Sequence, residues 1–149
     1  MHELAATGVG FLLSVLWFDL MFDVQVRGHR EPMLPAEVRD SIAAYYRRVT
    51  TAARPMNRLV ALAMLVTLVA LAGEVAGDDV GSWVAWTSLV LAAAAIGLAG
   101  ARTVRNAIRL GAQTDDAVTQ SALARSILRD HVLCVLAIGA TLVLQVVAA

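Results

Sequence analysis

The sequence contains no lysine and only one cysteine, and charged residues make up 16% of its 149 positions. A single cysteine, Cys134, cannot form a disulfide within the chain, which excludes a disulfide scaffold and a cluster of thiolate metal ligands. Soluble domains carry about 25% charged residues, so the low charge argues against a soluble protein. The twelve basic residues balance twelve acidic ones, and this balance gives no reason to expect a nucleic-acid partner.

Long apolar runs occupy most of the chain. They are Leu4–Phe18, Leu59–Gly73, Val80–Ala101 and Val132–Ala149. A transmembrane helix needs about 20 residues, so the first two runs must include polar residues at their ends. We therefore expect an all-α fold: an integral membrane four-helix bundle, forming a single domain over 1–149, with spans at about 4–23, 56–76, 81–101 and 131–148.

The basic residues are strongly sorted along the chain. All twelve are arginines, and they lie either between the first and second spans or between the third and fourth. The segments on the opposite side contain Glu3, Glu74, Asp78 and Asp79 but no arginine. By the positive-inside rule, we expect a multi-pass protein of the cytoplasmic (inner) membrane with both termini on the outer side.

The two arginine-bearing segments predict helices that continue beyond the lipid. Segment 24–55 is expected to be a loop followed by an amphipathic helix that starts near Pro35, because its apolar residues recur at helical spacing. Segment 102–130 is expected to form a helical hairpin. Helices 2, 3 and 4 are therefore extended on the cytoplasmic side.

Local signals set the expected helix ends. Ser82 is a candidate N-cap for the third span, and Gly111 stands where the C-cap of its extension belongs. Thr114 or Asp115 is expected to cap the last helix.

Polar side chains gather where the spans meet the cytoplasmic side. Asp19 and Asp23 lie one turn apart on one helix face, and carboxylates at membrane depth need partners. The candidate ligand-binding residues are these two together with Tyr46, Arg54, Asn57, Arg58, Arg102, Arg105, Asn106, Arg109, Arg125 and Arg129. His131 is the candidate catalytic acid or base, because histidine titrates near neutrality. Neighbouring residues on a helix diverge by about 100°, so Asp130 is not expected to orient it.

The sequence shows no cluster of metal-ligand residues and no phosphate-binding or nucleophile motif, so no metal and no cofactor is predicted. Three functions stay open. The chain could bind or convert a small amphipathic molecule, anionic or phenolic, in a pocket at the cytoplasmic leaflet. It could instead be a structural or partner-binding membrane subunit, or a small transporter that works as an oligomer. The expected partners are the lipid bilayer, a small amphipathic ligand and further copies of the chain.

Four segments resemble the anthrone-oxygenase-like family of small four-span membrane proteins. They are Leu34–Pro35–Ala36, Ala53–Arg54–Pro55–Met56–Asn57, Arg102–Thr103–Val104–Arg105–Asn106 and the return helix from Leu123 to His131. The resemblance implies cofactor-free oxidation of an electron-rich aromatic substrate, with Asn57 and Asn106 as the positions most directly matched.

Overall fold

The computed structural model describes residues 1–77 and 80–148, except for the side chain of Arg54. The helices are α1 (His2–Asp23), α2 (Ala36–Arg47), α3 (Arg54–Ala76), α4 (Ser82–Leu98), α5 (Val104–Ala112) and α6 (Ala117–Val147). A short 3-10 turn, η1 (Val24–Val26), follows α1, and two π-helical turns, η2 (Arg48–Ala52) and η3 (Ala99–Thr103), follow α2 and α4. The described residues contain no β-strand, so the expected all-α fold is confirmed.

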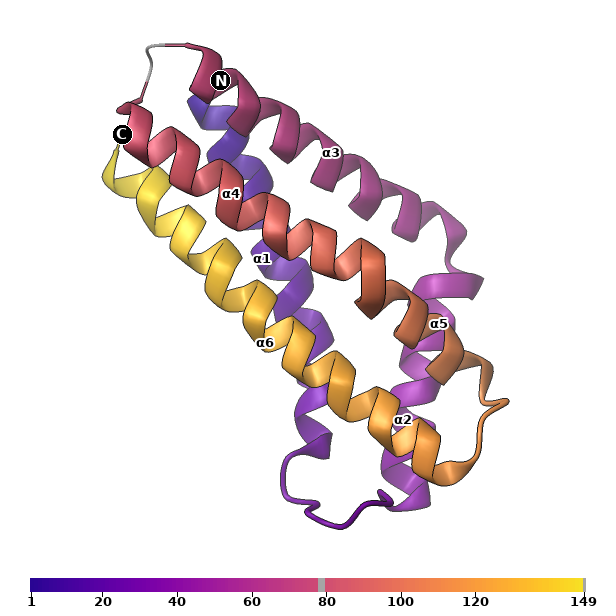
Figure 1. The fold of residues 1–149 in the computed structure, drawn as a ribbon. Coiled ribbons are helices and arrows are strands. Elements are labelled where there is room, and N and C mark those ends of the chain that lie inside the picture. Colours follow the sequence, from indigo (N-terminus) through magenta and orange to yellow (C-terminus); the bar gives the residue numbers. More distant parts are fainter. Residues whose placement is uncertain (78–79, 149) are drawn as a thin grey trace.

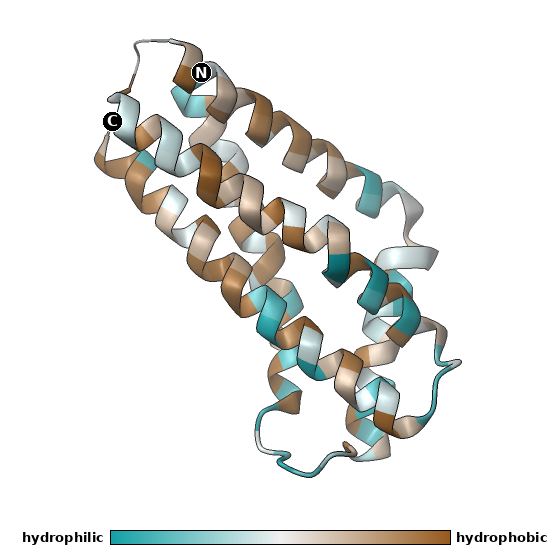
Figure 2. Cartoon of the chain, viewed as in Figure 1, coloured by the Kyte–Doolittle hydropathy of each residue, from teal (hydrophilic) through white to brown (hydrophobic). Residues whose placement is uncertain are grey.

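Four helical stretches are long and apolar enough to cross a membrane: 2–26, 55–76, 82–112 and 117–147. Figure 2 shows hydrophobic residues along most of their length. The protein is therefore a multi-pass membrane protein, and the four stretches correspond to the four expected spans. The third stretch joins α4, η3 and α5, and both it and α6 extend well beyond the expected spans, toward the loop that connects α5 to α6.

The four long helices form a ring in which α1 and α4 each lie between α3 and α6. Both chain termini are at one end of this bundle, and the loops before α2 and before α6 are at the other (Figure 1). We call these the terminal end and the arginine end, because the arginines all lie in 27–58 and 102–129.

Two separate apolar clusters hold the chain together. The first lies among the four long helices and consists of Ala5, Val9, Leu12, Ala70, Leu71, Ala92, Ala95, Cys134 and Ile138. Small residues let these helices approach closely: a Cβ atom built at Gly8 would stand 2.2 Å from Thr67 Oγ1. The second lies at the arginine end and joins α2, α5 and the start of α6 through Val26, Leu34, Ile42, Ala43, Tyr46, Ala107, Leu110, Leu123, Ala124 and Ile127.

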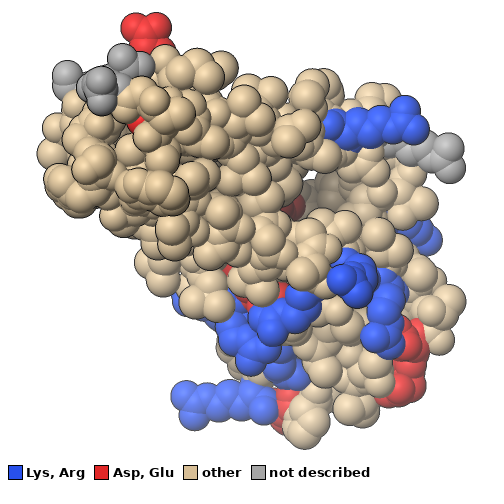
Figure 3. Space-filling model, turned by 45° about the horizontal axis from the view of Figure 1, so that its top comes forward, with Lys and Arg blue, Asp and Glu red and all other residues tan. Residues whose placement is uncertain are grey.

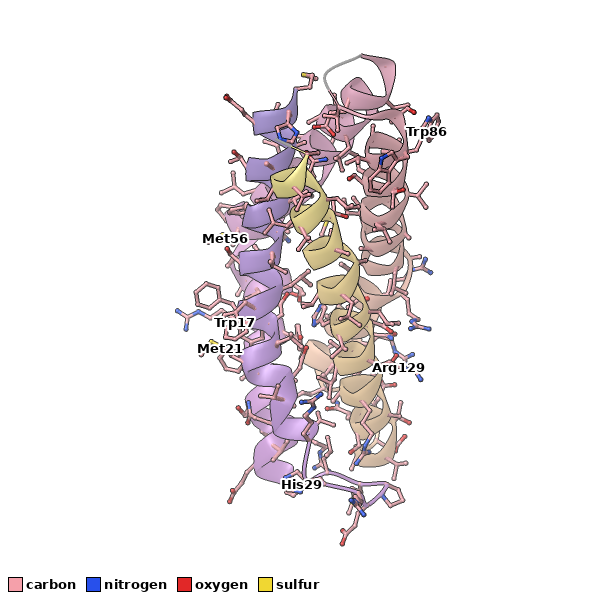
Figure 4. All side chains as sticks on the ribbon, turned by 90° about the vertical axis from the view of Figure 1, so that its left-hand side faces the viewer. Trp17, Met21, His29, Met56, Trp86 and Arg129 are labelled. Carbon is pink, nitrogen blue, oxygen red and sulfur yellow. The ribbon has the colours of Figure 1, made fainter. Side chains whose placement is uncertain are left out.

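Large side chains cover the outside of the bundle. Figure 4 shows Trp17, Met21 and Met56 pointing away from the helices on one side and Trp86 pointing away nearer the terminal end. Trp17 and Trp86 are 68% and 57% exposed. In a protein that crosses a membrane, such side chains face lipid rather than water.

Three expected helix ends are wrong. Gly81, not Ser82, is the N-cap of α4. Asp116 caps α6 by accepting from the backbone N–H groups of Val118 and Thr119, because the loop turns one or two residues later than expected. Gly111 lies inside α5, which ends when Gln113 takes a left-handed φ of 53°.

Gly111 serves helix packing. A Cβ atom there would stand 2.7 Å from the backbone nitrogen of Arg47, so only glycine allows α5 to cross α2 this closely.

Candidate functional site

A layer of polar side chains lies between the two apolar clusters. It consists of Asp19, Asp23, Tyr45, Tyr46, Arg102, Thr103, Asp130 and His131, and we call it the polar layer. Four segments supply it: α1, α2, η3 and α6. Because apolar side chains lie on both sides, its polar atoms must be satisfied largely by one another.

His131 is held between two carboxylates of α1. Its Nδ1 lies 2.6 Å from Asp23 Oδ2, and its Nε2 lies 3.8 Å from Asp19 Oδ2. Tyr46 donates its hydroxyl to Asp23 Oδ1 over 2.6 Å and lies 3.4 Å from His131 Nδ1. Asp23, Tyr46 and His131 are all buried, so this trio forms the closed part of the polar layer.

Asp19 forms the more open part. Its Oδ1 accepts the hydroxyl of Tyr45 over 2.7 Å, and the Tyr45 ring stacks on Phe22 with centroids 3.9 Å apart and planes 10° apart. The Asp19 side chain is 17% exposed. Figure 3 shows a hollow with an acidic side chain inside it and arginine side chains nearby. Because the Asp19 side chain is partly exposed, it can be reached from outside the bundle.

Asp130 faces a different side of α6 from His131. It accepts the Nε and Nη2 groups of Arg102 and, over 3.3 Å, the hydroxyl of Thr103. This separation follows from the 100° step between neighbouring helix residues. Arg102 therefore supplies the countercharge of a fully buried carboxylate.

Both tyrosines of the polar layer are strongly biased toward their neutral form. Burial, followed by the nearby Asp23 and Asp19 carboxylates, raises the pKa of Tyr46, and burial with Asp19 raises the pKa of Tyr45. Their hydroxyls therefore stay protonated and act as hydrogen-bond donors to the two carboxylates.

The structure brings five of the expected site residues into the polar layer: Asp19, Asp23, Tyr46, Arg102 and His131. Three members, Tyr45, Thr103 and Asp130, were not among the expected site residues. Two of them could have been suspected from the sequence, because Tyr45 adjoins Tyr46 and Asp130 adjoins His131. The partner helix of each side chain could not be read from the sequence.

Other expected site residues have different partners. Arg109 pairs with Asp115 over 2.8 Å. Arg125 donates to the backbone carbonyls of His29, Glu31 and Pro32, and so holds the loop before α2. These two arginines are therefore committed to the chain itself rather than to a shared pocket.

The two asparagines matched by the family resemblance lie outside the polar layer. Asn57 is exposed and donates to the carbonyl of Thr50 over 2.9 Å. Asn106 donates to Ser126 Oγ over 3.4 Å.

The remaining expected arginines are exposed or not described. Arg58, Arg105 and Arg129 are exposed, and Figure 4 shows Arg129 pointing away from the bundle. The side chain of Arg54 lies outside the described part of the structure. The polar layer therefore contains three carboxylates and one arginine, Arg102.

A separate surface depression lies in the loop before α2. His29, Arg30, Leu34 and Arg39 are among the residues that line it, and none of its lining residues belongs to the polar layer. It is open, and its lining residues include no buried polar side chain that points to a ligand, so the polar layer remains the candidate site.

Comparisons with known proteins leave the chain to be interpreted from its own residues. Neither the protein-family models nor the curated proteins nor the solved structures compared with it gave a match.

Proposed function

We propose that the protein binds a small amphipathic molecule with a phenolic head group at the arginine end of the bundle. The observation that carries the proposal is the contact between Tyr45 and Asp19. A phenol of the chain itself donates to this partly exposed carboxylate while its ring stacks on Phe22. A free phenol with an apolar tail in the lipid would make the same two interactions.

The charges of the polar layer favour a phenol over an anion. Asp19, Asp23 and Asp130 face one arginine, Arg102, and one histidine, His131. Even with the histidine protonated, these five groups leave one negative charge in excess. A hydrogen-bond donor is attracted to such a site, whereas an anion would be repelled.

His131 can act as the proton acceptor for the bound molecule. Its two nitrogens face Asp23 and Asp19, and a histidine held between carboxylates suits general base catalysis. A phenol that donates to Asp19 would lie close to His131 Nε2. In an oxygenase-like conversion with molecular oxygen as the oxidant, His131 would take the phenolic proton as an electron leaves the ring, so that no phenolate forms beside the aspartates.

The orientation of the protein belongs to the same proposal. The arginines at one end support a cytoplasmic location for that end and an outer location for both termini, by the positive-inside rule. The test labels intact cells with a membrane-impermeant thiol reagent. A Ser82→Cys variant should react and a Gln113→Cys variant should not, both made in a Cys134→Ala background; the reverse pattern refutes this orientation.

Binding is tested with 4-hexylphenol and protein in lipid nanodiscs. Protein-loaded discs should take up more of the phenol than empty discs. Asp19→Asn should weaken this extra uptake about tenfold, a factor that corresponds to loss of one good hydrogen bond. Asp40→Asn is the matched control, because Asp40 is an exposed acid bonded to Gln113 at the surface. Equal uptake by the wild type and Asp19→Asn refutes the proposal.

Tyr45 gives a second, opposite readout. If its phenol occupies the position of the ligand, Tyr45→Ala removes an internal competitor and should tighten binding of 4-hexylphenol. Tighter binding in Tyr45→Ala cannot result from general loss of structure.

A structural role is the second candidate, and one observation favours it. Each carboxylate of the polar layer already has a hydrogen-bond partner within the described chain. In that case Asp19→Asn lowers thermal stability, and neither the wild type nor Tyr45→Ala takes up the phenol beyond empty discs.

A further inference from the structure

A second group of polar side chains, three of them fully buried, lies at the terminal end of the bundle. Each long helix contributes one: His2 from α1, Glu74 from α3, Ser88 from α4 and Gln145 from α6. Glu74, Ser88 and Gln145 are 0% exposed, whereas the side chain of His2 is 22% exposed. None of these residues belongs to the polar layer, and the proposed function does not use them.

Glu74 and Ser88 both contact the amide of Gln145, and His2 contacts Glu74. Gln145 Nε2 lies 2.9 Å from Glu74 Oε2 and 3.3 Å from Ser88 Oγ. His2 Nδ1 lies 3.2 Å from Glu74 Oε1. Oε1 of Gln145 is buried and has no hydrogen-bond partner among the residues that the structure describes. A buried acceptor without a donor is unfavourable, so this oxygen points to a further ligand.

We propose that Glu74, Ser88 and Gln145 form a binding site for a monovalent alkali cation, with sodium as the cation that fits. Rotation of the Gln145 amide by 180° exchanges its oxygen and nitrogen without changing its shape. Oε1 would then lie beside Glu74 Oε2 and Ser88 Oγ. Three oxygens from three helices repel one another unless a cation lies between them.

The orientation of the Gln145 amide in the structure also supports a cation site. The N–H groups of Gln145 point at the carboxylate of Glu74 and the hydroxyl of Ser88. They supply the partial positive charge that a bound cation would supply in full. The same rotation would place Oε1 against a bound cation and move Nε2 to the position that Oε1 occupies now.

The donor set favours a hard monovalent ion. Carboxylate, amide and hydroxyl oxygens suit hard cations rather than soft ones. Calcium sites use several charged oxygens, whereas this set has the single carboxylate of Glu74, which balances one positive charge. His2 covers the carboxylate on the partly exposed side and marks the direction from which an ion would enter.

The experiment measures thermal unfolding of the full chain in a non-ionic detergent while sodium chloride replaces choline chloride at constant ionic strength. The Tm of the wild type should rise with sodium and reach a plateau, because a cation that binds only the folded protein stabilises it. Glu74→Gln should remove the response. Ser88→Ala should raise the half-saturating sodium concentration by about tenfold, as loss of one ligand would. Glu31→Gln, a change at an exposed loop acid, should respond like the wild type.

Two results overturn the proposal: a wild-type Tm that does not change when sodium replaces choline, and a response that persists in Glu74→Gln. If Glu74→Gln does not fold, line broadening of the sodium-23 magnetic resonance signal provides the second measurement. The wild type should broaden the signal more than Ser88→Ala at equal concentration, and equal broadening refutes the site.

Discussion

The sharpest prediction compares the two neighbouring tyrosines of the polar layer. Tyr46→Phe and Tyr45→Phe remove the same atom, a phenolic oxygen that donates to an aspartate of α1. Both variants keep the ring, so the stacking of residue 45 on Phe22 is retained. The two acceptor aspartates differ in burial. Asp23, the partner of Tyr46, is 0% exposed in its side chain, whereas Asp19, the partner of Tyr45, is 17% exposed in its side chain. Tyr46 itself is 2% exposed.

The burial of the acceptor aspartate determines how much stability each variant is expected to lose. A hydrogen bond to a charged group contributes about 1.5–3 kcal/mol, and in Tyr46→Phe no water can replace the donor to the fully buried Asp23. We expect a loss of about 2 kcal/mol for Tyr46→Phe. Water can reach Asp19, so Tyr45→Phe should cost less than about 1 kcal/mol. For a chain of this length 1 kcal/mol corresponds to about 2–4 °C in Tm, so the expected losses are about 4–8 °C for Tyr46→Phe and less than about 4 °C for Tyr45→Phe.

Cys134 provides the assay. It is the single cysteine of the chain and is buried in the apolar cluster of the bundle. A thiol-reactive fluorescent dye therefore reports unfolding on heating without any added label. A loss of Tm in Tyr45→Phe equal to or larger than that in Tyr46→Phe would refute the reasoning, because it would show that burial of the carboxylate does not set the cost.

Three further predictions concern other features. Burial and the aspartates raise the pKa of Tyr45 and Tyr46, so the stability that their neutral forms provide is present below about pH 10, the ordinary tyrosine pKa, and is lost above it. Phenolate absorbance should therefore stay flat until the protein unfolds. Titration of these tyrosines in the folded protein near pH 10 would contradict this prediction. Asp116 has a pKa lowered by its hydrogen bonds from Thr119 and Val118, so its contribution is present at neutral pH and is lost as pH falls through that lowered pKa. Asp116→Ala should therefore lower Tm at pH 7 and should have a smaller effect at pH 3. Gly111→Ala should destabilise by about 1–3 kcal/mol through overpacking against α2, measured by thermal unfolding, whereas Gly97→Ala, where the added methyl meets nothing within 4 Å, should not.

The main features of the fold follow from the sequence because they depend on local pattern. Apolar runs of membrane-spanning length predict the four long helices, and the absence of proline within 102–110 allows the third span to continue into α5. Errors occurred at the helix ends. Ser82, Thr114 and Gly111 are all residue types that favour caps, but the loop path and the crossing of α5 over α2 decided which residue served.

The candidate site could likewise be predicted from the sequence only in part. The sequence identified Asp19, Asp23 and His131 as polar groups at similar depth, because charged residues inside apolar helices are recognisable without coordinates. It could not show that Tyr46 and His131 share Asp23, since those three side chains are separated by 23 and 108 positions along the chain. Nor could it separate the arginines that pair within the chain from those that remain exposed.

The sequence by itself therefore determined how many helices cross the membrane and which end carries the positive charge, because hydropathy and charge are summed over local segments. Only the tertiary structure decided which polar groups meet. Asp130 is hydrogen-bonded to Arg102 and His131 to Asp23, and at the terminal end Glu74 is hydrogen-bonded to Gln145. Hydrogen bonding acts over about 3 Å, so these pairings depend on how the helices are rotated and offset, which the local pattern of any one helix does not specify.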